Sequence, residues 1–170
     1  VSGKVVYRDS RVALEVLELV GRDGSTKTKA VLRHLGALVI LPLLDDGRVV
    51  LIENRRVALG ATLLELPAGT LEGDEAPIDQ AARELREETG YVASAIEPLL
   101  SFYASPGICD ERMHGFVARG LVAGTQELDP TEEIGVVVRT WDEVMRAIRD
   151  GELVDGKSLA LLLYWDRFGA

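Results

Sequence analysis

GTLEGDEAPIDQAARELREETGY, residues 69–91, concentrates acidic side chains on one predicted helix. Pro77 suits a first helical turn, because its missing N–H has no intrahelical partner there, and Gly90 suits the left-handed residue after the last turn. The stretch therefore predicts a helix over residues 77–89. At about 100° per residue, one edge of this helix carries Glu84, Glu87 and Glu88. Its apolar face is predicted to comprise Ile78, Ala81, Ala82 and Leu85.

The three glutamates on one edge oppose helix formation. Like charges at this spacing destabilise an isolated helix by roughly 0.2–0.5 kcal/mol per pair, and the helix C-terminus is the unfavourable end of the dipole for anions. One interpretation is a solvated acidic face, partly neutralised by Arg83 and Arg86. The other is a site for a divalent cation such as Mg²⁺ or Mn²⁺, which prefers oxygen ligands. Composition alone favours the solvated face.

The composition is that of one acidic globular protein. The chain has 170 residues and a net charge of −9, and its pI near 4.8 argues against a nucleic-acid-binding surface. A phosphorylated substrate would therefore need a cation as mediator. The longest apolar run, at 35–44, is too short to span a bilayer, and no targeting leader is recognised. We expect a cytoplasmic protein without a membrane partner. The single cysteine, Cys109, excludes an internal disulfide.

Short alternating segments predict β-strands on both sides of the helix. They cover residues 4–9, 11–20, 25–35, 35–44, 48–56, 96–105, 112–122 and 133–141. Two further helices are predicted at 141–151 and 157–168. No repeat or linker divides the chain. We expect one domain over residues 1–170, of the α/β or α+β class, with a β-sheet covered by helices.

The spacing of the acidic stretch changes its interpretation. The fixed positions are Gly69, Glu75, Arg83, Glu84, Leu85, Glu87, Glu88, Gly90 and Tyr91. They resemble, position by position, the signature G-x5-E-x7-R-E-U-x-E-E-x-G-U of the Nudix hydrolases, in which U is a bulky apolar residue. Only Tyr91 departs from the usual pattern, because an aliphatic residue is common there. The resemblance implies the Nudix fold, a mixed β-sheet sandwiched between α-helices, and Mg²⁺-dependent hydrolysis of a diphosphate, with Mn²⁺ as a substitute.

The resemblance also implies roles for residues of the signature. The implied metal ligands are Glu84, Glu88, the backbone carbonyl of Ala68, and Glu87 as a ligand or as the partner of one. Arg83 is implied to hold carboxylates in place, such as Glu75 or Glu87, rather than to contact substrate. The acidic edge of the helix is thus interpreted as a binding site for cations that in turn bind a pyrophosphate.

Two flanking stretches resemble the ADP-ribose and nucleotide-sugar pyrophosphatases of this family. They are ENRRVALGATLLELPAGTLEGDE at 53–75 and SFYASPGICDE at 101–111. Pro106 follows Gly90 by 16 residues, a spacing that marks ADP-ribose hydrolysis in the subgroup. By the same resemblance Arg56 binds phosphate, and Glu111 lies near the terminal ribose or the diphosphate.

The general base is left open by the sequence. The resemblance points to a late acidic loop, LDPTEEIGVVV at 128–138, which offers Glu132 and Glu133. Glu132 is preferred, but Pro130 and Thr131 stand where the subgroup commonly carries more acids. Glu87, or a metal-bound hydroxide without a dedicated base, are the alternatives.

A homodimer is also implied by the resemblance, in which N-terminal antiparallel strands, residues 1–33, cross over from a catalytic core at 34–170. The rival hydrolase functions are cleavage of a dinucleoside polyphosphate or of an oxidised nucleoside triphosphate. A binding module that holds ADP-ribose without cutting it, and a purely structural domain, are the alternatives outside catalysis.

Overall fold

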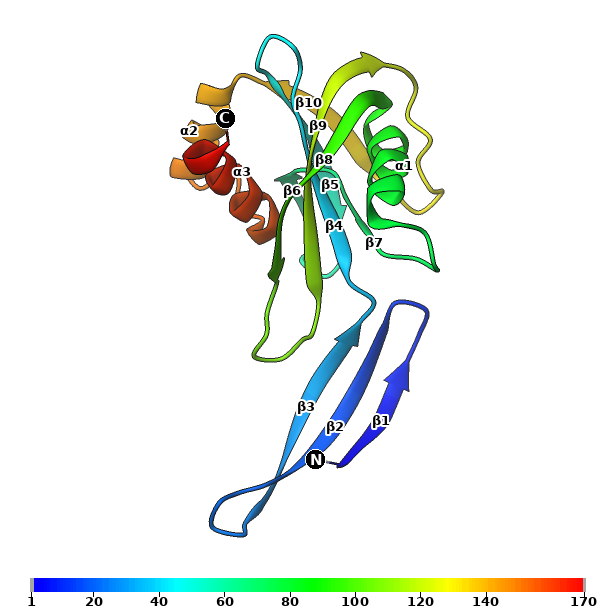
Figure 1. Ribbon diagram of the computed structural model, residues 1–170, viewed down its shortest axis with the longest axis vertical. Helices are drawn as coiled ribbons and strands as arrows, with labels where there is room; N and C mark the ends of the chain where they lie inside the picture. The colour runs from blue at the N-terminus through cyan, green and yellow to red at the C-terminus, as the bar shows by residue number, and fades with distance from the viewer. Residues whose placement is uncertain (1, 170) are drawn as a thin grey trace.

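The computed structural model describes residues 2–169, which form a layered body with a separate β-sheet projecting from one end (Figure 1). The strands are β1 Ser2–Arg8, β2 Val12–Val20, β3 Thr26–His34, β4 Ala37–Pro42, β5 Val49–Arg56, β6 Ala61–Glu65, β7 Ala68–Thr70, β8 Tyr91–Tyr103, β9 Arg112–Ala123 and β10 Ile134–Arg139. The helices are α1 Pro77–Thr89, α2 Trp141–Arg149 and α3 Gly156–Phe168. None of these helices is long and apolar enough to cross a membrane.

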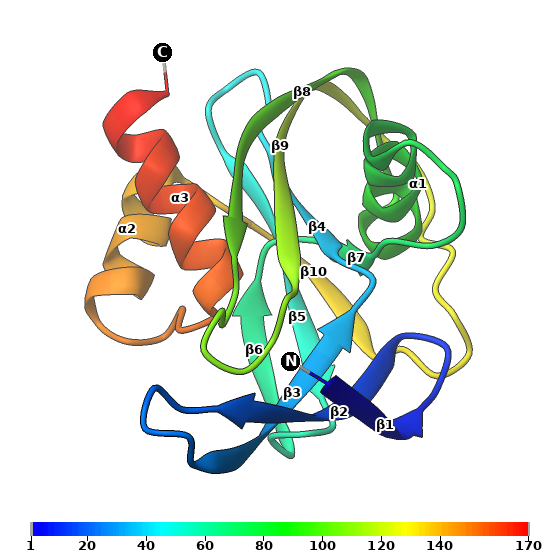
Figure 2. The same ribbon diagram turned by 60° about the horizontal axis from the view of Figure 1, so that its bottom comes forward.

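Two sheets form the body. The first is mixed, in the order β7-β4-β9-β8, with β4 parallel to β9 and antiparallel to β7. The second is antiparallel, in the order β10-β5-β6. Helix α1 covers one side of these sheets, and α2 and α3 cover the other (Figure 2). The predicted mixed sheet between helices is therefore present.

Strand β4 lies at the centre of the body, and all of its residues are buried. Its alternate side chains point to opposite faces, because a strand repeats every two residues. One apolar cluster joins β4 to α2 and α3 and includes Val39, Leu41, Val144 and Leu161. The other joins β4 to α1 and consists of Leu38, Ile40, Ala81, Leu85, Phe116 and Ala118. The strand therefore needs apolar residues at every position rather than at every second one.

The predicted helix over residues 77–89 is confirmed, with Pro77 in its first turn and Gly90 in a left-handed conformation after its end. Of its predicted apolar face, only Ala81 and Leu85 are buried. Ile78 is 39% exposed, and Ala82 is exposed as well. The buried positions are Gln80, Ala81, Leu85, Glu88 and Thr89. The helix is rotated so that two polar side chains, those of Gln80 and Glu88, face the sheet, where they bind backbone groups of the loop and of β7.

The stretch TLLELPAG, residues 62–69, divides into two strands in different sheets. Strand β6 pairs with β5, whereas β7 pairs with β4. Pro67 lies at the break, where it has no N–H to donate to a ladder, and its carbonyl oxygen accepts a hydrogen bond from the Ile40 amide at 2.9 Å. The chain therefore crosses from one sheet to the other immediately before the signature residues.

Strands β1, β2 and β3 form an antiparallel sheet of their own, as predicted. A bridge between Leu32 and Cys109 connects this sheet to the loop before β9. The chain enters β4 through Gly36, whose φ of +97° favours glycine. A Cβ added to Gly36 would lie 3.1 Å from Leu71 and 3.2 Å from the Arg112 carbonyl oxygen. The junction between the sheet and the body is thus built around a residue without a side chain.

We predict that Gly36→Ala lowers the free energy of unfolding by about 2–4 kcal/mol, because it combines backbone strain with crowding against a carbonyl. Gly24→Ala is the matched control: Gly24 also has a positive φ, of +80°, but a Cβ there meets nothing within 4 Å. The control should lose about 1 kcal/mol. Urea denaturation of both variants measures the difference, and equal losses would contradict the role given to packing at Gly36.

Candidate active site

A cleft of about 940 Å³ opens between α1, the β6–β7 segment and the start of α3. Four cationic side chains line it, Arg11, Arg56, Arg83 and Lys157. Ten carboxylates line it as well: Glu65, Glu72, Glu84, Glu87, Glu88, Glu111, Glu127, Asp129, Glu132 and Asp155. The cleft therefore carries an excess of negative charge.

Glu88 is the most deeply buried acid of the α1 edge, with 3% exposure. Its Oε2 accepts a hydrogen bond from the Ala68 amide at 2.8 Å. Burial raises the pKa of Glu88 from 4.5 to about 8; the Ala68 bond opposes this rise, and the charges of Glu84 and Glu132 add to it. Burial also raises the pKa of Glu84, against the opposing charge of Arg83. These two acids are held where a negative charge is costly unless a cation joins them.

Gly69 allows α1 to approach β7 this closely. A Cβ at Gly69 would lie 2.5 Å from Oε1 of Glu84 and 2.7 Å from its Cγ. Any side chain at this position would therefore displace the Glu84 carboxylate. The glycine of the signature is explained by this contact, because its φ is not in the left-handed region.

The Ala68 carbonyl faces the same side as these carboxylates. The Ile40 amide donates to the Pro67 carbonyl oxygen at 2.9 Å, and Val39 is opposite Ala68. Hydrogen-bonded and non-bonded pairs alternate in an antiparallel ladder, so Ala68 turns its N–H and C=O away from β4. Its N–H binds Glu88, and the C=O of a strand residue points to the same side as its N–H.

These groups fit a hard divalent cation. Within residues 2–169 no three His, Cys, Asp or Glu side chains are gathered closely enough to hold an ion by themselves. A cation here would instead take oxygens from Glu84, Glu88 and the Ala68 carbonyl, and complete its shell with water, as Mg²⁺ commonly does. The raised pKa values of both acids have the origin expected for such a site, since the same burial that disfavours the free anions favours a bound cation.

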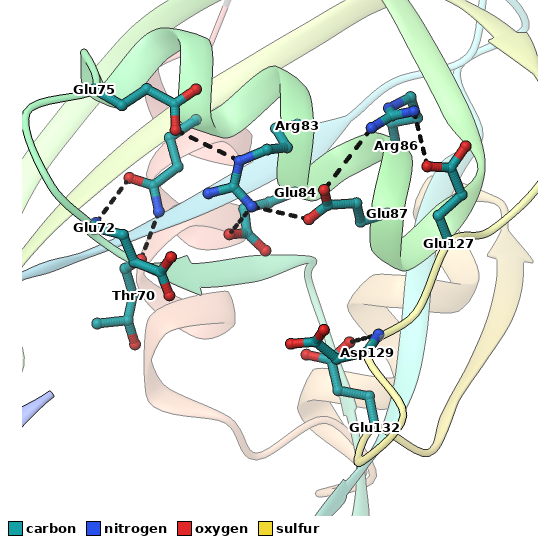
Figure 3. A network of polar contacts seen from close by, with 11 residues as sticks. Thr70, Glu72, Glu75, Arg83, Glu84, Arg86, Glu87, Glu127, Asp129 and Glu132 are labelled. Carbon is teal, nitrogen blue, oxygen red and sulfur yellow. Dashed lines mark hydrogen bonds and ion pairs between the residues drawn. The ribbon is translucent and has the colours of Figure 1, made fainter. Parts of the chain in front are cut away.

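Arg83 lies among the carboxylates of the acidic edge (Figure 3). Its Nη1 is 2.9 Å from Glu87 and 3.3 Å from Glu84, and its Nε is 3.4 Å from Glu75. Glu87 is also 3.8 Å from Arg86. Arg83 therefore screens these carboxylates from one another, and Glu87 contacts both arginines, although Arg86 lies closer to Glu127, at 2.9 Å.

The loop before β10 places one of its two candidate bases in the cleft. Glu132 lines the cleft, and its Oε2 accepts a hydrogen bond from the Asp129 amide at 3.1 Å (Figure 3). Glu133 is not among the lining residues; its carbonyl oxygen accepts a hydrogen bond from the Arg55 amide. Of the pair, Glu132 is the acid that faces the α1 carboxylates.

Of the three residues expected to bind substrate, Arg56 and Glu111 line the cleft and Pro106 does not. Arg56 lines the cleft and is bound to the buried carboxylate of Glu65, which raises the pKa of Arg56 further above its ordinary value. Glu111 also lines the cleft. Pro106 does not, and lies in an exposed turn in which the Ile108 and Cys109 amides donate to the Ser105 carbonyl oxygen. The structure thus brings Arg56 and Glu111 into one cavity and leaves Pro106 outside it.

The comparison with protein families decides the affiliation of the chain, because the model described as the NUDIX domain matches residues 32–162. The chain belongs to the NUDIX family. This family is generally dependent on divalent metals, in agreement with the oxygen groups gathered at the acidic edge.

Two relatives resemble nearly the whole chain. A protein named methanol dehydrogenase activator from Bacillus methanolicus is 35% identical over 161 residues, which cover 94% of this chain and 87% of the relative. An ADP-ribose pyrophosphatase from Bacillus subtilis (strain 168) is 34% identical over 168 residues, which cover 95% of this chain and 91% of the relative. The expected resemblance to ADP-ribose pyrophosphatases is therefore confirmed.

The Nudix fold is confirmed as well. A solved structure entitled "Crystal structure of ADP compounds hydrolase" matches the chain with a TM-score of 0.85. The match covers 98% of this chain and 91% of the other, at 22% sequence identity. At this identity the likeness concerns the fold alone, including the projecting N-terminal sheet.

The sequence analysis missed Glu65, Lys157 and Asp155. Glu65 is fully buried and bound to Arg56 and Lys157. Two local signals could have indicated Glu65 and Lys157: an acid between two apolar residues, Leu64 and Leu66, at the end of a strand, and a lysine in the first turn of a helix, where the dipole disfavours cations. Both positions are unfavourable without a partner.

We predict that Glu88→Gln stabilises the metal-free protein at alkaline pH. An acid whose pKa is raised from 4.5 to about 8 binds more protons in the native than in the unfolded state between these values, so its unfavourable effect on stability grows as the pH rises. With a chelator present, the gain should be within about 0.5 kcal/mol at pH 5 and on the order of 2–4 kcal/mol at pH 8.5. Urea titrations across this range give the answer, with exposed Glu97→Gln as the control. If the Glu88→Gln variant is less stable than the wild type at pH 8.5, the charge penalty is contradicted.

Gly69→Ala is expected to weaken divalent-cation binding at least tenfold, because the new Cβ must displace the Glu84 carboxylate. Binding of Mn²⁺, followed by electron paramagnetic resonance, measures this change without any substrate. Gly107→Ala serves as the control, since a Cβ there meets nothing within 4 Å. An unchanged Mn²⁺ affinity in the Gly69→Ala variant would remove Glu84 from the set of ligands.

Proposed function

We propose that this protein hydrolyses the diphosphate bond of ADP-ribose or a related nucleoside diphosphate sugar, with Mg²⁺ as cofactor and Mn²⁺ as a substitute. The products are a nucleoside monophosphate and a sugar phosphate. The observation that carries the proposal is the pair of carboxylates, buried Glu88 and partly buried Glu84, beside the Ala68 carbonyl and in one cleft with Arg56. The 34% identity to an ADP-ribose pyrophosphatase over most of the chain supports the substrate class.

The acidic edge of α1 binds the cofactor in this proposal. Glu84, Glu88 and the Ala68 carbonyl hold the cations, and Arg83 positions the surrounding carboxylates of Glu75, Glu84 and Glu87. When bound, the cations polarise phosphoryl oxygens and lower the pKa of a coordinated water. Glu87, which contacts Arg83 and Arg86, serves the site as a further ligand or as the partner of one.

Three other lining residues, Arg56, Glu111 and Glu132, bind the substrate or accept the proton of the attacking water. Arg56 presents a planar guanidinium to the diphosphate oxygens, a geometry that suits bidentate contacts. Glu132 takes a proton from the water that adds to one phosphorus, while the oxygen bridging the two phosphorus atoms leaves with the other phosphate. Glu111 accepts hydrogen bonds from ribose hydroxyls at the opposite side of the cleft. Glu133 and Pro106 have no contact with substrate; Pro106 shapes the loop that ends at Glu111.

The charge of the cleft explains why the cofactor is needed for binding as well as for chemistry. An anionic diphosphate that enters a cleft with ten acids and four cationic side chains meets net repulsion. Bound divalent cations reverse the local sign of the charge. Substrate affinity is therefore expected to require the metal.

The proposal extends to the assembly. We propose that residues 1–170 act as one Nudix domain, in the cytoplasm, without nucleic-acid or membrane partners. The N-terminal segment, residues 1–33, mediates a homodimer, and the exposed apolar side chains of its sheet, Val5, Val6, Tyr7, Leu14 and Val20, supply the contact surface.

The test is product analysis after incubation with Mg²⁺, by chromatography. The substrates are ADP-ribose, ADP-glucose, UDP-glucose, a diadenosine polyphosphate and an oxidised deoxynucleoside triphosphate. We expect preferential release of AMP from ADP-ribose, loss of turnover with a chelator, and a decrease of at least about 100-fold in kcat for Glu88→Gln but not for Glu97→Gln. Turnover confined to the last two substrates would replace the substrate class, and no turnover with Mg²⁺ or Mn²⁺ would favour a binding module.

A further inference from the structure

The buried carboxylate of Glu65 lies at the end of β6, between Leu64 and Leu66 of the core. Its side chain has no exposed surface, yet it borders the cleft. A carboxylate in this position is unfavourable unless cations and hydrogen-bond donors surround it. Two cations do so, Arg56 from the neighbouring strand β5 and Lys157 from the first turn of α3.

Glu65 holds the Arg56 guanidinium by one edge. Nε of Arg56 donates to Oε1 of Glu65 at 2.7 Å, and Nη2 donates to Oε2. This two-point contact fixes the plane of the guanidinium as well as its position. It uses the edge formed by Nε and Nη2, and so leaves the Nη1 hydrogens for a ligand in the cleft. The Arg56 side chain keeps 40% of its surface exposed.

Lys157 connects this pair to helix α3. Its Nζ donates to Oε2 of Glu65 and lies 2.9 Å from Oδ2 of Asp155. Asp155 caps α3 by accepting from the Ser158 amide at 3.0 Å. The Ser158 hydroxyl in turn accepts a hydrogen bond from the Leu66 amide at 2.8 Å. A closed set of contacts therefore joins the first turn of α3 to the end of β6.

The charged residues of this set have no net charge, because the two acids, Glu65 and Asp155, are balanced by Arg56 and Lys157. Glu65 could be neutralised by Arg56 alone, and Lys157 by Asp155 alone. The second bond to Glu65 therefore adds orientation rather than charge balance: Lys157 holds Oε2 in addition to Arg56. A carboxylate held by both cations cannot rotate away from the arginine.

We infer that Glu65 is a positioning residue for phosphate binding, which it serves by presenting Arg56 to the cleft, and that Lys157 of α3 fixes Glu65 in this role. The inference rests on the proposed function in one respect, the contact of Arg56 with phosphate oxygens. It makes substrate affinity depend on a helix whose sequence is remote from the signature.

A double-mutant cycle between Arg56 and Glu65 tests the inference. The variants are Arg56→Ala, Glu65→Gln and the double variant, all loaded with Mg²⁺. The probe is inorganic pyrophosphate, whose Kd is measured by calorimetry. The KM for ADP-ribose is measured in parallel. We expect Glu65→Gln to raise both values about tenfold with kcat within about threefold, because an amide offers only one acceptor to the two donors of Arg56. In the Arg56→Ala background the same change should alter either value less than about twofold.

An equal loss in both backgrounds, or no loss in either, would overturn the positioning role. If the Glu65→Gln variant does not fold, Glu65→Asp replaces it in the cycle, because the shorter acid keeps the charge but cannot reach both donors. Failure of the proposed function gives a different result: the wild type then cleaves no diphosphate, while the pyrophosphate cycle still reports on the Arg56–Glu65 pair.

Lys157 variants test the part played by α3. Lys157→Met should raise the Kd for pyrophosphate at least about threefold, and Lys157→Arg should restore most of the loss, since it keeps a donor to Glu65. Glu152→Gln is the matched control, because Glu152 binds Arg139 at 2.6 Å outside the cleft. Its Kd should stay that of the wild type. An unchanged Kd in the Lys157→Met variant would exclude α3 from the site.

Discussion

The site depends on one contact between a strand and a helix, the hydrogen bond from the Ala68 amide to the Glu88 carboxylate. Together with the bond from the Gln80 amide to the Thr70 carbonyl oxygen, it fixes the distance and the rotation of α1 relative to β7. Gly69 makes the approach sterically feasible. Because the Pro67 carbonyl oxygen takes the hydrogen bond from Ile40, the N–H and C=O of the next residue, Ala68, point away from β4. The same contact brings the Ala68 carbonyl, Glu84 and Glu88 to one side, and the burial that accompanies it raises the pKa of Glu88. The positions of these oxygen groups and the raised pKa of Glu88 thus have a common origin, the close packing of α1 against β7.

The two sides of the cleft accommodate their charged side chains in different ways. On the α1 side, acids are gathered without enough cationic side chains to balance them, an arrangement suited to binding a cation from solution. On the α3 side, Glu65 and Asp155 are matched by Arg56 and Lys157 within the chain. If the proposed function holds, the first arrangement lowers the stability of the metal-free protein and favours the binding of a cofactor. The second arrangement is complete without a ligand, so it is suited to orientation.

The sequence predicted those parts that are encoded locally. The ends of α1 follow from Pro77 and Gly90, and the fixed spacing of the signature was sufficient for the family and the fold. The buried face of α1 was mispredicted in part, because apolar periodicity cannot indicate that Gln80 will bind the Thr70 carbonyl and Glu88 the Ala68 amide. The network of Glu65 was missed because Lys157 is 92 residues away in the chain. Only the packing of α3 against the sheets brings them together.

Strand β4 limits where residues can be inserted or deleted during evolution. Its alternate side chains belong to two different apolar clusters, one beneath α1 and one beneath α2 and α3. Insertion or deletion of a single residue in β4 would exchange the two sets of side chains and disturb both clusters at once. The exposed turn around Gly24 has no such restriction, since nothing would meet a Cβ there within 4 Å. Variation in length among homologues should therefore be confined to the projecting sheet and the loops, and be absent from β4.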